Sequence, residues 1–365
     1  MKAAILGVGL IGGSLALCLK ERTSCHVSGY DLSQKTLDWA VAAGVIDDGS
    51  RNLEEAVEDA DFIFLAVPVG TIPELLSRLE RQSLSPGCII SDVGSTKGKL
   101  VRWSEPFRKR GVTYIGGHPM AGSHRSGVEA AHSLLFENAY YILTPSPETP
   151  LSEVQKLSGL LQEATRAKLV IMDPFHHDRL VGAISHLPHV IASGLVNQVG
   201  RYNEENEWFH RLAAGGFRDL TRIAASHPVM WRDILMSNRG ELLKLMDDWL
   251  SEMEEVRDAI KRGDAEKIED FFRRAKFLRE RLPERRKGML LPSFECYVDV
   301  PDQPGMIGRV AMLLGEEGIN LSNIGIMENR EDTAGVLRLV FQKEEDLKRA
   351  IRFLNEAGYR VFSFD

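Results

Sequence analysis

His118 is the residue of this chain whose type and position best suit chemistry. It follows the glycine pair Gly116-Gly117 and precedes Pro119, so we do not expect it inside a helix. A neutral imidazole in such a position can accept a hydrogen bond from a substrate hydroxyl, and that bond strengthens as the hydroxyl carbon loses a hydride. The competing interpretation is a loop histidine that only caps backbone groups.

Several polar side chains farther along the chain suit a small substrate with two carboxylates. They are a serine and two histidines in an otherwise apolar helical run, followed by arginines, acids and a tryptophan: Ser185, His186, His189, Arg218, Asp219, Arg222, Trp231, Arg232 and Asp233. Guanidinium groups match the geometry of carboxylates, so we expect this set to bind a dicarboxylate. Structural ion pairs, Arg218 with Asp219 or Arg232 with Asp233, are the competing explanation.

The first residues contain the pattern of a dinucleotide-binding turn. Gly7-x-Gly9-x-x-Gly12 follows an apolar run at residues 3–6 and precedes an expected helix. Gly7 permits the tight turn, Gly9 lets the backbone approach a pyrophosphate, and Gly12 lets the helix pack on the strand. Asp31 lies about 20 residues beyond the last glycine, where a carboxylate can bind the adenosine ribose. No basic residue follows it closely, so NAD is favoured over NADP.

The first half of the chain alternates between apolar strands and amphipathic helices. Strands are expected at residues 3–6, 26–30, 61–68, 88–92, 112–115, 140–143 and 169–172. This alternation predicts a mainly parallel, doubly wound α/β sheet of the Rossmann type, in which ligands bind beyond the carboxyl ends of the strands. Ser95, on the turn after one strand, is expected to orient His118 or to contact the nicotinamide. The residues expected to contact the cofactor are Gly7, Gly9, Leu10, Ile11, Gly12, Asp31, Val67, Pro68 and Asp92.

Two further domains are expected after the sheet. Apolar residues follow helical spacing at residues 176–200, 230–262 and 265–281, and the apolar surface of these helices predicts a homodimer or a higher homo-oligomer. A charged linker with proline and glycine spans residues 281–288. Beyond it strands are expected at residues 293–300, 318–326, 334–342 and 360–364, with one helix between the first two and another between the last two. This βαββαβ pattern is a ferredoxin-like antiparallel sheet with helices on one face. The expected domains are an NAD-binding domain at 1–172, an all-helical substrate and dimerisation domain at 173–285, and a regulatory domain at 293–365.

Composition and charge argue against several classes of protein. The 365 residues carry a formal net charge of -7, which argues against a nucleic-acid partner. The four cysteines show no paired spacing, so we expect neither a disulfide framework nor a metal site, and we expect a cytoplasmic protein. No stretch is expected to span a membrane, and the glycine-rich N-terminus does not suit a signal peptide.

Five segments together resemble the prephenate/arogenate dehydrogenases of tyrosine biosynthesis. They are Gly7-Val-Gly-Leu-Ile-Gly-Gly-Ser14, Asp92-Val-Gly-Ser-Thr-Lys-Gly98, residues 117–127, Ser185-His-Leu-Pro-His189, and residues 216–224 with residues 230–234. The resemblance implies NAD-dependent oxidative decarboxylation of prephenate to 4-hydroxyphenylpyruvate, with arogenate as the alternative substrate. It also implies a catalytic role for His118, a place for Ser95 in the same site, and substrate binding by His189 and Arg222.

One position departs from the family. Some members carry an acidic residue two positions after the Ala-Gly pair, where it pairs with the substrate-binding arginine and gates the site, whereas this chain has His124. The gating role is therefore not carried over. A protein that keeps the nucleotide-binding fold as a sensor or scaffold, without catalysis, is the alternative from another functional class.

The C-terminal segment resembles an ACT domain, a module that binds amino acids at subunit interfaces. The resemblance depends on the turn Asp302-x-Pro304-Gly305 and on Gly318-Ile-Asn320-Leu321. It implies that L-tyrosine binds around Asp302, Pro304, Gly305 and Asn320 as a feedback inhibitor. A purely oligomerising role is the alternative, because a fold does not prove a ligand.

Overall fold

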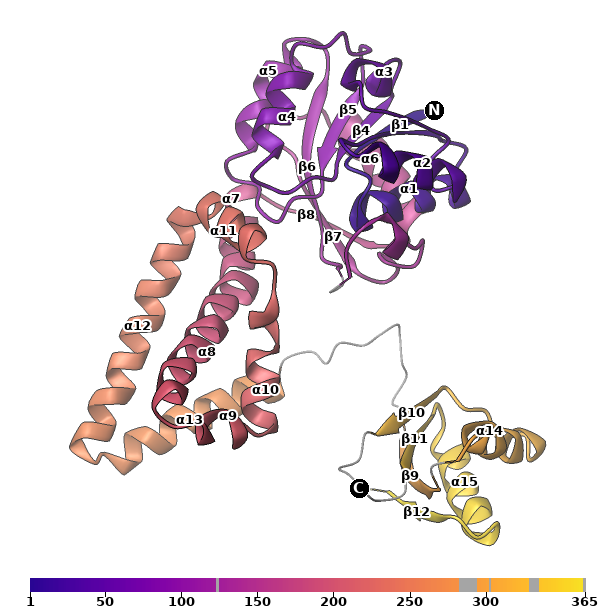
Figure 1. The fold of residues 1–365 in the computed structure, drawn as a ribbon, viewed down its shortest axis with the longest axis vertical. Coiled ribbons are helices and arrows are strands. Elements are labelled where there is room, and N and C mark those ends of the chain that lie inside the picture. The colour runs from indigo at the N-terminus through magenta and orange to yellow at the C-terminus, as the bar shows by residue number, and fades with distance from the viewer. Residues whose placement is uncertain (123–124, 282–293, 302, 328–334, 364–365) are drawn as a thin grey trace. The chain divides into compact units, whose positions relative to one another are not determined.

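The structure is a computed structural model of the whole chain, and it describes residues 1–122, 125–281, 294–301, 303–327 and 335–363 (Figure 1). The chain divides into two compact units, Met1–Ala275 and Lys276–Asp365. Two residues singled out in the sequence, His124 and Asp302, lie outside the described residues, as does most of the linker expected at residues 281–288.

The first unit begins with an eight-stranded sheet in the order β3-β2-β1-β4-β5-β6-β7-β8. The strands are β1 (Lys2–Leu6), β2 (His26–Tyr30), β3 (Asp48–Ser50), β4 (Phe62–Leu65), β5 (Ile89–Asp92), β6 (Thr113–Pro119), β7 (Tyr140–Thr144) and β8 (Lys168–Ile171). All neighbouring strands are parallel except β6 and β7. The predicted doubly wound sheet is therefore confirmed, and its strand order reverses between β1 and β4, where such sheets bind ligands.

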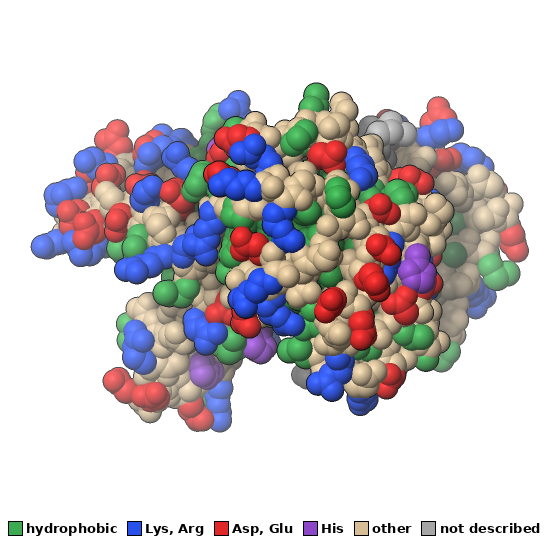
Figure 2. Space-filling view, turned by 90° about the horizontal axis from the view of Figure 1, so that it is seen from above, with side chains coloured by type: hydrophobic (Ala, Val, Ile, Leu, Met, Phe, Trp, Pro, Cys, Tyr) green, Lys and Arg blue, Asp and Glu red, His purple; other side chains and the backbone are tan. Residues whose placement is uncertain are grey.

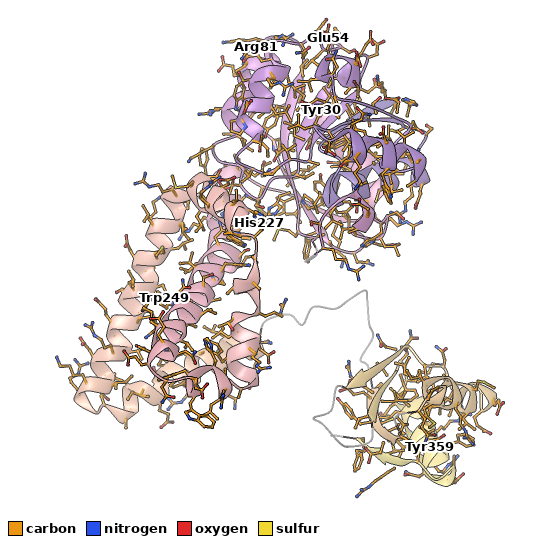
Figure 3. All side chains as sticks on the ribbon, in the orientation of Figure 1. Tyr30, Glu54, Arg81, His227, Trp249 and Tyr359 are labelled. Atoms are coloured by element: carbon orange, nitrogen blue, oxygen red, sulfur yellow. The ribbon has the colours of Figure 1, made fainter. Side chains whose placement is uncertain are left out.

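Both faces of this sheet are buried because successive side chains of a strand point to opposite sides. Ala3 and Ile5 of β1 join one core cluster, whereas Ala4 and Leu6 join the other. Tyr30, labelled in Figure 3, belongs to this second cluster. The first cluster includes residues of α1 (Leu10–Arg22), α2 (Gln34–Ala42) and α6 (Leu151–Thr165), and the second includes residues of α3 (Leu53–Val57), α4 (Ile72–Leu79) and α5 (Ser104–Arg108). Helices on both faces explain why the strands are continuous apolar runs in the sequence.

The rest of the first unit is helical, as predicted, and its last helix continues past Ala275 to Glu280. Its elements are α7 (Pro174–Val181), a π-helical turn (Gly182–His186), α8 (Leu187–Glu205), α9 (Trp208–Arg211), α10 (Gly215–Thr221), a 3-10 turn (Arg222–Ala225), α11 (Pro228–Ser237), α12 (Arg239–Arg262) and α13 (Ala265–Glu280). The helical spacing expected over residues 230–262 is confirmed, but Asn238 divides the stretch into two helices, α11 and α12. The buried amide of Asn238 donates to the backbone carbonyl of Asp178 and to a ring nitrogen of His186, and these bonds hold the break between α11 and α12.

The run from α7 to α8 corrects the expectation that no stretch is long and apolar enough to span a membrane. By length and composition alone, Pro174–Glu205 is apolar enough to cross a membrane, and 22% of its most apolar window is buried within the chain. Exposed apolar side chains occur on α8 itself and on the neighbouring helices α10 and α12: Val196, Tyr202, Leu220, Leu243, Leu250 and Ile260. An apolar surface on several adjoining helices is what a subunit interface requires. Acidic and basic side chains are interspersed on the face shown in Figure 2.

The second unit contains a four-stranded antiparallel sheet in the order β10-β11-β9-β12. Its elements are β9 (Phe294–Val300), α14 (Met306–Glu316), β10 (Asn323–Met327), β11 (Gly335–Phe341), α15 (Glu344–Glu356) and β12 (Arg360–Phe362). Alternate residues of β9, Cys296 and Val298, share a core with Val310 of α14 and Leu354 of α15. The predicted βαββαβ fold is confirmed, although the strand expected at residues 318–326 begins only at Asn323.

All four cysteines are free and buried. Burial raises the pKa of Cys18 to about 11 and the pKa of Cys88 and Cys296 to about 12. These three thiols are therefore protonated and unreactive at neutral pH.

Candidate active site

Strand β6 carries His118 at the edge of the sheet where the parallel strands end. The expectation that His118 follows the strand is wrong, because pairing with β7 continues through Pro119 and sets His118 opposite Ile142. The preceding glycine pair permits close packing, since a Cβ on Gly117 would lie 2.5 Å from the carbonyl oxygen of Asp92. The pair therefore lets β6 lie directly against the end of β5.

The imidazole of His118 is hydrogen-bonded to a second histidine, from the helical segment. Nδ1 of His118 lies 2.8 Å from Nε2 of His177, and Nδ1 of His177 lies 2.9 Å from a carboxylate oxygen of Asp178. His177 is fully buried and His118 is half-buried. Burial lowers the pKa of His118 well below its usual range, and the neighbouring His177 and the charge of Lys97 act in the same direction. His118 is therefore neutral at physiological pH and suited to accept a hydrogen bond.

Asp178 also holds the loop that follows β5. Its two carboxylate oxygens accept hydrogen bonds from the backbone N–H groups of Lys97 and Gly98, at 2.7 and 2.8 Å. The hydroxyl of Thr96, in the same loop, lies 2.6 Å from the hydroxyl of Ser237 at the end of α11. These bonds join the sheet to α7 and α11, so the residues of the two parts keep a defined geometry across the site.

Asp92 ends β5, but its side chain points into the protein. The carboxylate is fully buried and accepts hydrogen bonds from the ammonium of Lys97, the phenol of Tyr114 and the backbone N–H of Gly94. Burial lowers the pKa of Lys97, while the adjacent carboxylate opposes that effect. The expectation that Asp92 contacts the cofactor is not supported for its side chain, which instead holds the loop that contains Ser95.

His189 and Trp231 meet on the helical side of the site. Their rings stack with centroids 3.8 Å apart and planes inclined by 26°, and the ring of His186 meets the same indole edge-on. Nδ1 of His189 lies 2.8 Å from the carbonyl oxygen of Ser185 in the π-helical turn. A carbonyl only accepts, so Nδ1 carries the hydrogen and Nε2 is the nitrogen that can bind a ligand. Such π-helical turns are frequent at functional sites.

Arg222 and Asp219 are exposed, and neither forms a side-chain hydrogen bond or ion pair within the part of the chain that the structure describes. Arg222 begins the 3-10 turn, which packs against α8. Ser95 is half-buried, and its hydroxyl likewise has no hydrogen-bond partner among the described residues. The hydrogen-bond partner of the His118 imidazole is therefore His177. The expectation that Ser95 orients this imidazole is not supported.

The competing explanation by structural ion pairs holds for one of the two candidate pairs. Arg232 forms an ion pair with Asp233 at 2.7 Å. Arg218 instead donates to the carbonyl oxygen of Ala213, so its expected pair with the next residue does not form.

The loop between β1 and α1 has the form that a dinucleotide requires. Gly7 has a φ of +100°, and a Cβ there would lie 2.5 Å from a backbone carbonyl oxygen. Gly9 precedes α1, and no atom lies within 4 Å of the place that its Cβ would take. The helix has no side-chain cap, so its first N–H groups are available to a phosphate. Asp31 accepts N–H bonds from Val8 and Ser33, at 3.0 and 2.9 Å, and so braces this loop.

The other residues expected at the cofactor lie along the same edge of the sheet. They are Leu10, Ile11 and Gly12 in the first turn of α1, and Val67 and Pro68 just after β4. Within the described ranges, no three His, Cys, Asp or Glu side chains are grouped so that they could hold a metal ion.

Reasoning from the sequence missed His177, Asp178 and Asn238. The sequence carried a signal for the first two. Pro174, His177, Asp178 and Val181 have the spacing of one helix face, and the structure shows that this face of α7 is buried. Two ionisable residues on the buried face of a helix need partners, and that need points to a site. No local pattern marks Asn238, whose partners lie on other elements.

Comparison with known proteins gives the family. Residues 15–171 match the family described as prephenate dehydrogenase, nucleotide-binding domain, and residues 173–274 match prephenate dehydrogenase, dimerization domain. The prephenate dehydrogenase of Bacillus subtilis (strain 168) is 42% identical over 369 residues, which cover 100% of this chain and 99% of that protein.

Two solved structures are similar to this chain over most of its length. The prephenate dehydrogenase from A. aeolicus, in complex with hydroxyphenyl propionate and NAD+, has 32% identity and a TM-score of 0.71, covering 77% of this chain and 97% of that chain. The Synechocystis arogenate dehydrogenase has 29% identity and a TM-score of 0.68, covering 77% of this chain and 99% of that chain. On the family matches and the full-length relative, this chain belongs to the prephenate dehydrogenase family.

Proposed function

We propose that this protein catalyses the NAD-dependent oxidative decarboxylation of prephenate to 4-hydroxyphenylpyruvate, a step of L-tyrosine biosynthesis. The main observation is the neutral, half-buried imidazole of His118 at the nucleotide-binding edge of the sheet. Family membership supports the proposal, as does the A. aeolicus relative, which holds NAD+ and hydroxyphenyl propionate. Gly7, Gly9 and the uncapped start of α1 fit the pyrophosphate of NAD.

For this reaction the protein needs only to position prephenate beside NAD and to accept one hydrogen bond from the ring hydroxyl. Prephenate carries a ring hydroxyl, a ring carboxylate and a second carboxylate on its side chain. NAD, when bound, supplies the acceptor for the hydride of the hydroxyl-bearing carbon. His118 accepts the hydrogen bond of the hydroxyl, which strengthens as the C–O bond gains carbonyl character. The electrons of the bond to the ring carboxylate enter the ring as carbon dioxide leaves, and the ring becomes aromatic.

We assign the binding of the two carboxylates of prephenate to Arg222 and His189, which lie in the helical part of the first unit. Arg222 offers a guanidinium that has no ion-pair partner among the described residues, and such groups bind carboxylates through two parallel bonds. His189 offers Nε2, because its Nδ1 is engaged by Ser185 and its ring is fixed by Trp231. Asp219 lies three positions before the arginine, and on that spacing we assign it to orient the guanidinium when substrate is bound.

The C-terminal unit is the proposed binding module for L-tyrosine, acting as a feedback inhibitor of the ACT type. Gly305 has a φ of +89° and is the N-cap of α14, so the turn after Pro304 presents a helix N-terminus that suits an amino-acid carboxylate. Asn320 lies in the connection between α14 and β10 and supplies an amide. Asp302, outside the described residues, is assigned to the same site. A unit that only joins subunits is the alternative.

We place the protein in the cytoplasm as a homodimer or a higher homo-oligomer. The exposed apolar faces of α8, α10 and α12 supply a subunit interface, and residues 173–274 match a dimerization domain. Four free, buried cysteines suit a reducing compartment.

Absorbance of NADH after the protein is mixed with NAD and prephenate tests the proposal. Formation of NADH and 4-hydroxyphenylpyruvate in equal amounts supports it, whereas no reduction of NAD favours a nucleotide-sensing scaffold. Arogenate differs from prephenate by an amino group in place of a keto oxygen on the side chain. The ratio of kcat/KM for the two compounds decides between them, and a higher value for arogenate would reassign the substrate.

A further inference from the structure

The hydrogen bonds around Asp178 determine which nitrogen of His177 carries hydrogen. Both oxygens of the Asp178 carboxylate accept backbone N–H groups, from Lys97 and Gly98, and Oδ1 also lies 2.9 Å from Nδ1 of His177. A carboxylate that receives such donors acts only as an acceptor, so Nδ1 of His177 must carry hydrogen. In a neutral imidazole the other nitrogen is then bare, and Nε2 of His177 is an acceptor.

The same reasoning extends to His118. Its Nδ1 lies 2.8 Å from Nε2 of His177, and two bare nitrogens cannot share a hydrogen bond. Nδ1 of His118 therefore carries hydrogen and donates to His177. Since the imidazole of His118 is neutral, its Nε2 is left bare, and this is the nitrogen that must accept a hydroxyl hydrogen.

We propose that Asp178 and His177 are positioning residues that hold His118 in the tautomer whose Nε2 accepts the hydrogen bond of the substrate hydroxyl. The inference rests on the proposed function of His118 and extends it to two buried residues that act through His118. A third group that orients an imidazole base is a recurring arrangement in enzymes, and the wrong tautomer there lowers turnover by as much as about 10⁴-fold.

The side chains of His177 and Asp178 are shielded from water, and several charged groups surround the two histidines His118 and His177. His177 is 0% exposed and Asp178 is 4% exposed. The charged or titratable groups that face the two histidines are Lys97 and Asp92 around the end of β5, Asp178 on α7, and His186 in the π-helical turn. Asn238 binds both the backbone carbonyl of Asp178 and Nδ1 of His186, so the helical side of the pair is fixed by neutral hydrogen bonds.

A proton added to this pair removes the acceptor. If His177 binds the proton, its Nε2 donates to Nδ1 of His118, and the hydrogen of His118 moves to Nε2. If His118 binds the proton, both of its nitrogens carry hydrogen. Either way the substrate hydroxyl meets an N–H, so we expect kcat to fall at acid pH with an apparent pKa that belongs to both histidines and not to His118 alone.

Nitrogen NMR of the full-length protein, labelled with 15N in histidine and saturated with NAD, reads the tautomer directly. The spectra of His118→Asn and His177→Gln assign the signals. We expect a protonated Nδ1 and a bare Nε2 for His118 at pH 7.5. A protonated Nε2 would overturn the proposal, whether or not the protein turns over prephenate, so this result is independent of the proposed function.

Two substitutions of His177 separate positioning from packing. His177→Gln puts an amide oxygen where Nε2 stood, so it keeps the acceptor for His118 and does not titrate. We expect kcat within about threefold of wild type and an acid limb displaced to lower pH. His177→Leu removes the acceptor, and we expect kcat to fall at least about 30-fold while KM for prephenate changes less than about threefold. Equal losses in both variants, with an unmoved pH profile, would overturn the proposal.

The adjacent histidine supplies a matched control. His176 is exposed, and its side chain has no hydrogen-bond partner among the described residues, so His176→Gln should keep the kcat, the KM and the pH profile of the wild type. NAD affinity and the melting temperature of each variant show whether it is folded. If wild-type protein reduces no NAD with prephenate, the proposed function fails, while the NMR result still decides the tautomer.

Discussion

The indole of Trp231 lies against the imidazole of His189, with ring centroids 3.8 Å apart. Trp231 belongs to α11 and His189 to α8, so the stack joins two helices that border the site. The indole N–H is buried and has no hydrogen-bond partner among the described residues. The stack thus fixes the plane of the imidazole to which we assign a substrate carboxylate.

Substitutions of Trp231 should act on substrate binding. Trp231→Ala removes the stacking partner, and aromatic contacts contribute about 0.5–1.5 kcal/mol beyond the area they bury, so we expect KM for prephenate to rise about five- to tenfold. Trp231→Phe keeps an aromatic face and should change KM less than about twofold. Steady-state kinetics with saturating NAD measures both, and identical KM values in the two variants would contradict the role given to the stack.

Breaking the buried pair of Lys97 and Asp92 should destabilise the first unit. Lys97→Met leaves a charged carboxylate in the core, and loss of one partner of a buried pair costs about 3–5 kcal/mol. The double variant with Asp92→Asn should lose less than the sum of the single variants, because neither charge remains. Urea denaturation measures these differences.

An exposed pair is the control for that measurement. Lys109 and Glu105 form an ion pair on α5 with both side chains mostly exposed, and Lys109→Met should leave the unfolding midpoint unchanged. A wild-type midpoint for Lys97→Met would show that the Lys97 charge is not needed in the core.

Stability should fall with acid between about pH 6.5 and pH 4 because of His186. Burial lowers the pKa of His186 to about 4, from 6.5 for an ordinary histidine. Over that range the unfolded chain binds a proton that the native protein does not, so the stability is complete above pH 6.5 and is lost as the pH falls toward 4. The bond that Nδ1 accepts from Asn238, at 3.1 Å, agrees with a neutral ring.

Melting temperatures measured between pH 4 and pH 7 test this. His186→Gln should show a shallower dependence on pH than the wild type, and His176→Gln, at an exposed site, should keep the wild-type dependence. The same slope in all three proteins would assign the acid sensitivity to other groups.

Much of the fold could be predicted because its determinants are local. Strands buried on both faces are continuous apolar runs, as in β1 and β4, and the first glycines can only suit a tight turn beside a strand. His118 could be found because a glycine pair and a proline keep it out of a helix.

The hydrogen bonds that set up the site could not be predicted in this way. His118 and His177 are 59 positions apart and meet only because α7 packs on the end of β6. The break at Asn238 is also invisible in the helical spacing, since its cause is two hydrogen bonds to residues more than 50 positions away. Such contacts depend on tertiary packing, which periodicity does not describe.

The C-terminal unit should be needed for inhibition but not for catalysis. A chain without residues 289–365 keeps the sheet, the helical segment and the proposed active site, so we expect it to oxidise prephenate and to lose inhibition by L-tyrosine. Initial rates with and without L-tyrosine measure this. Competitive inhibition that survives the deletion would mean that L-tyrosine binds at the active site.

The most direct test of the whole account is the turnover of His118→Asn with NAD and prephenate. An amide in place of the imidazole loses an acceptor needed mainly in the transition state, so kcat should fall about 100-fold or more while KM for prephenate and the affinity for NAD stay within about threefold. A single turnover with excess enzyme, followed by NADH absorbance, isolates the hydride transfer. A wild-type rate in that experiment would contradict the assignment of His118 as the acceptor for the substrate hydroxyl.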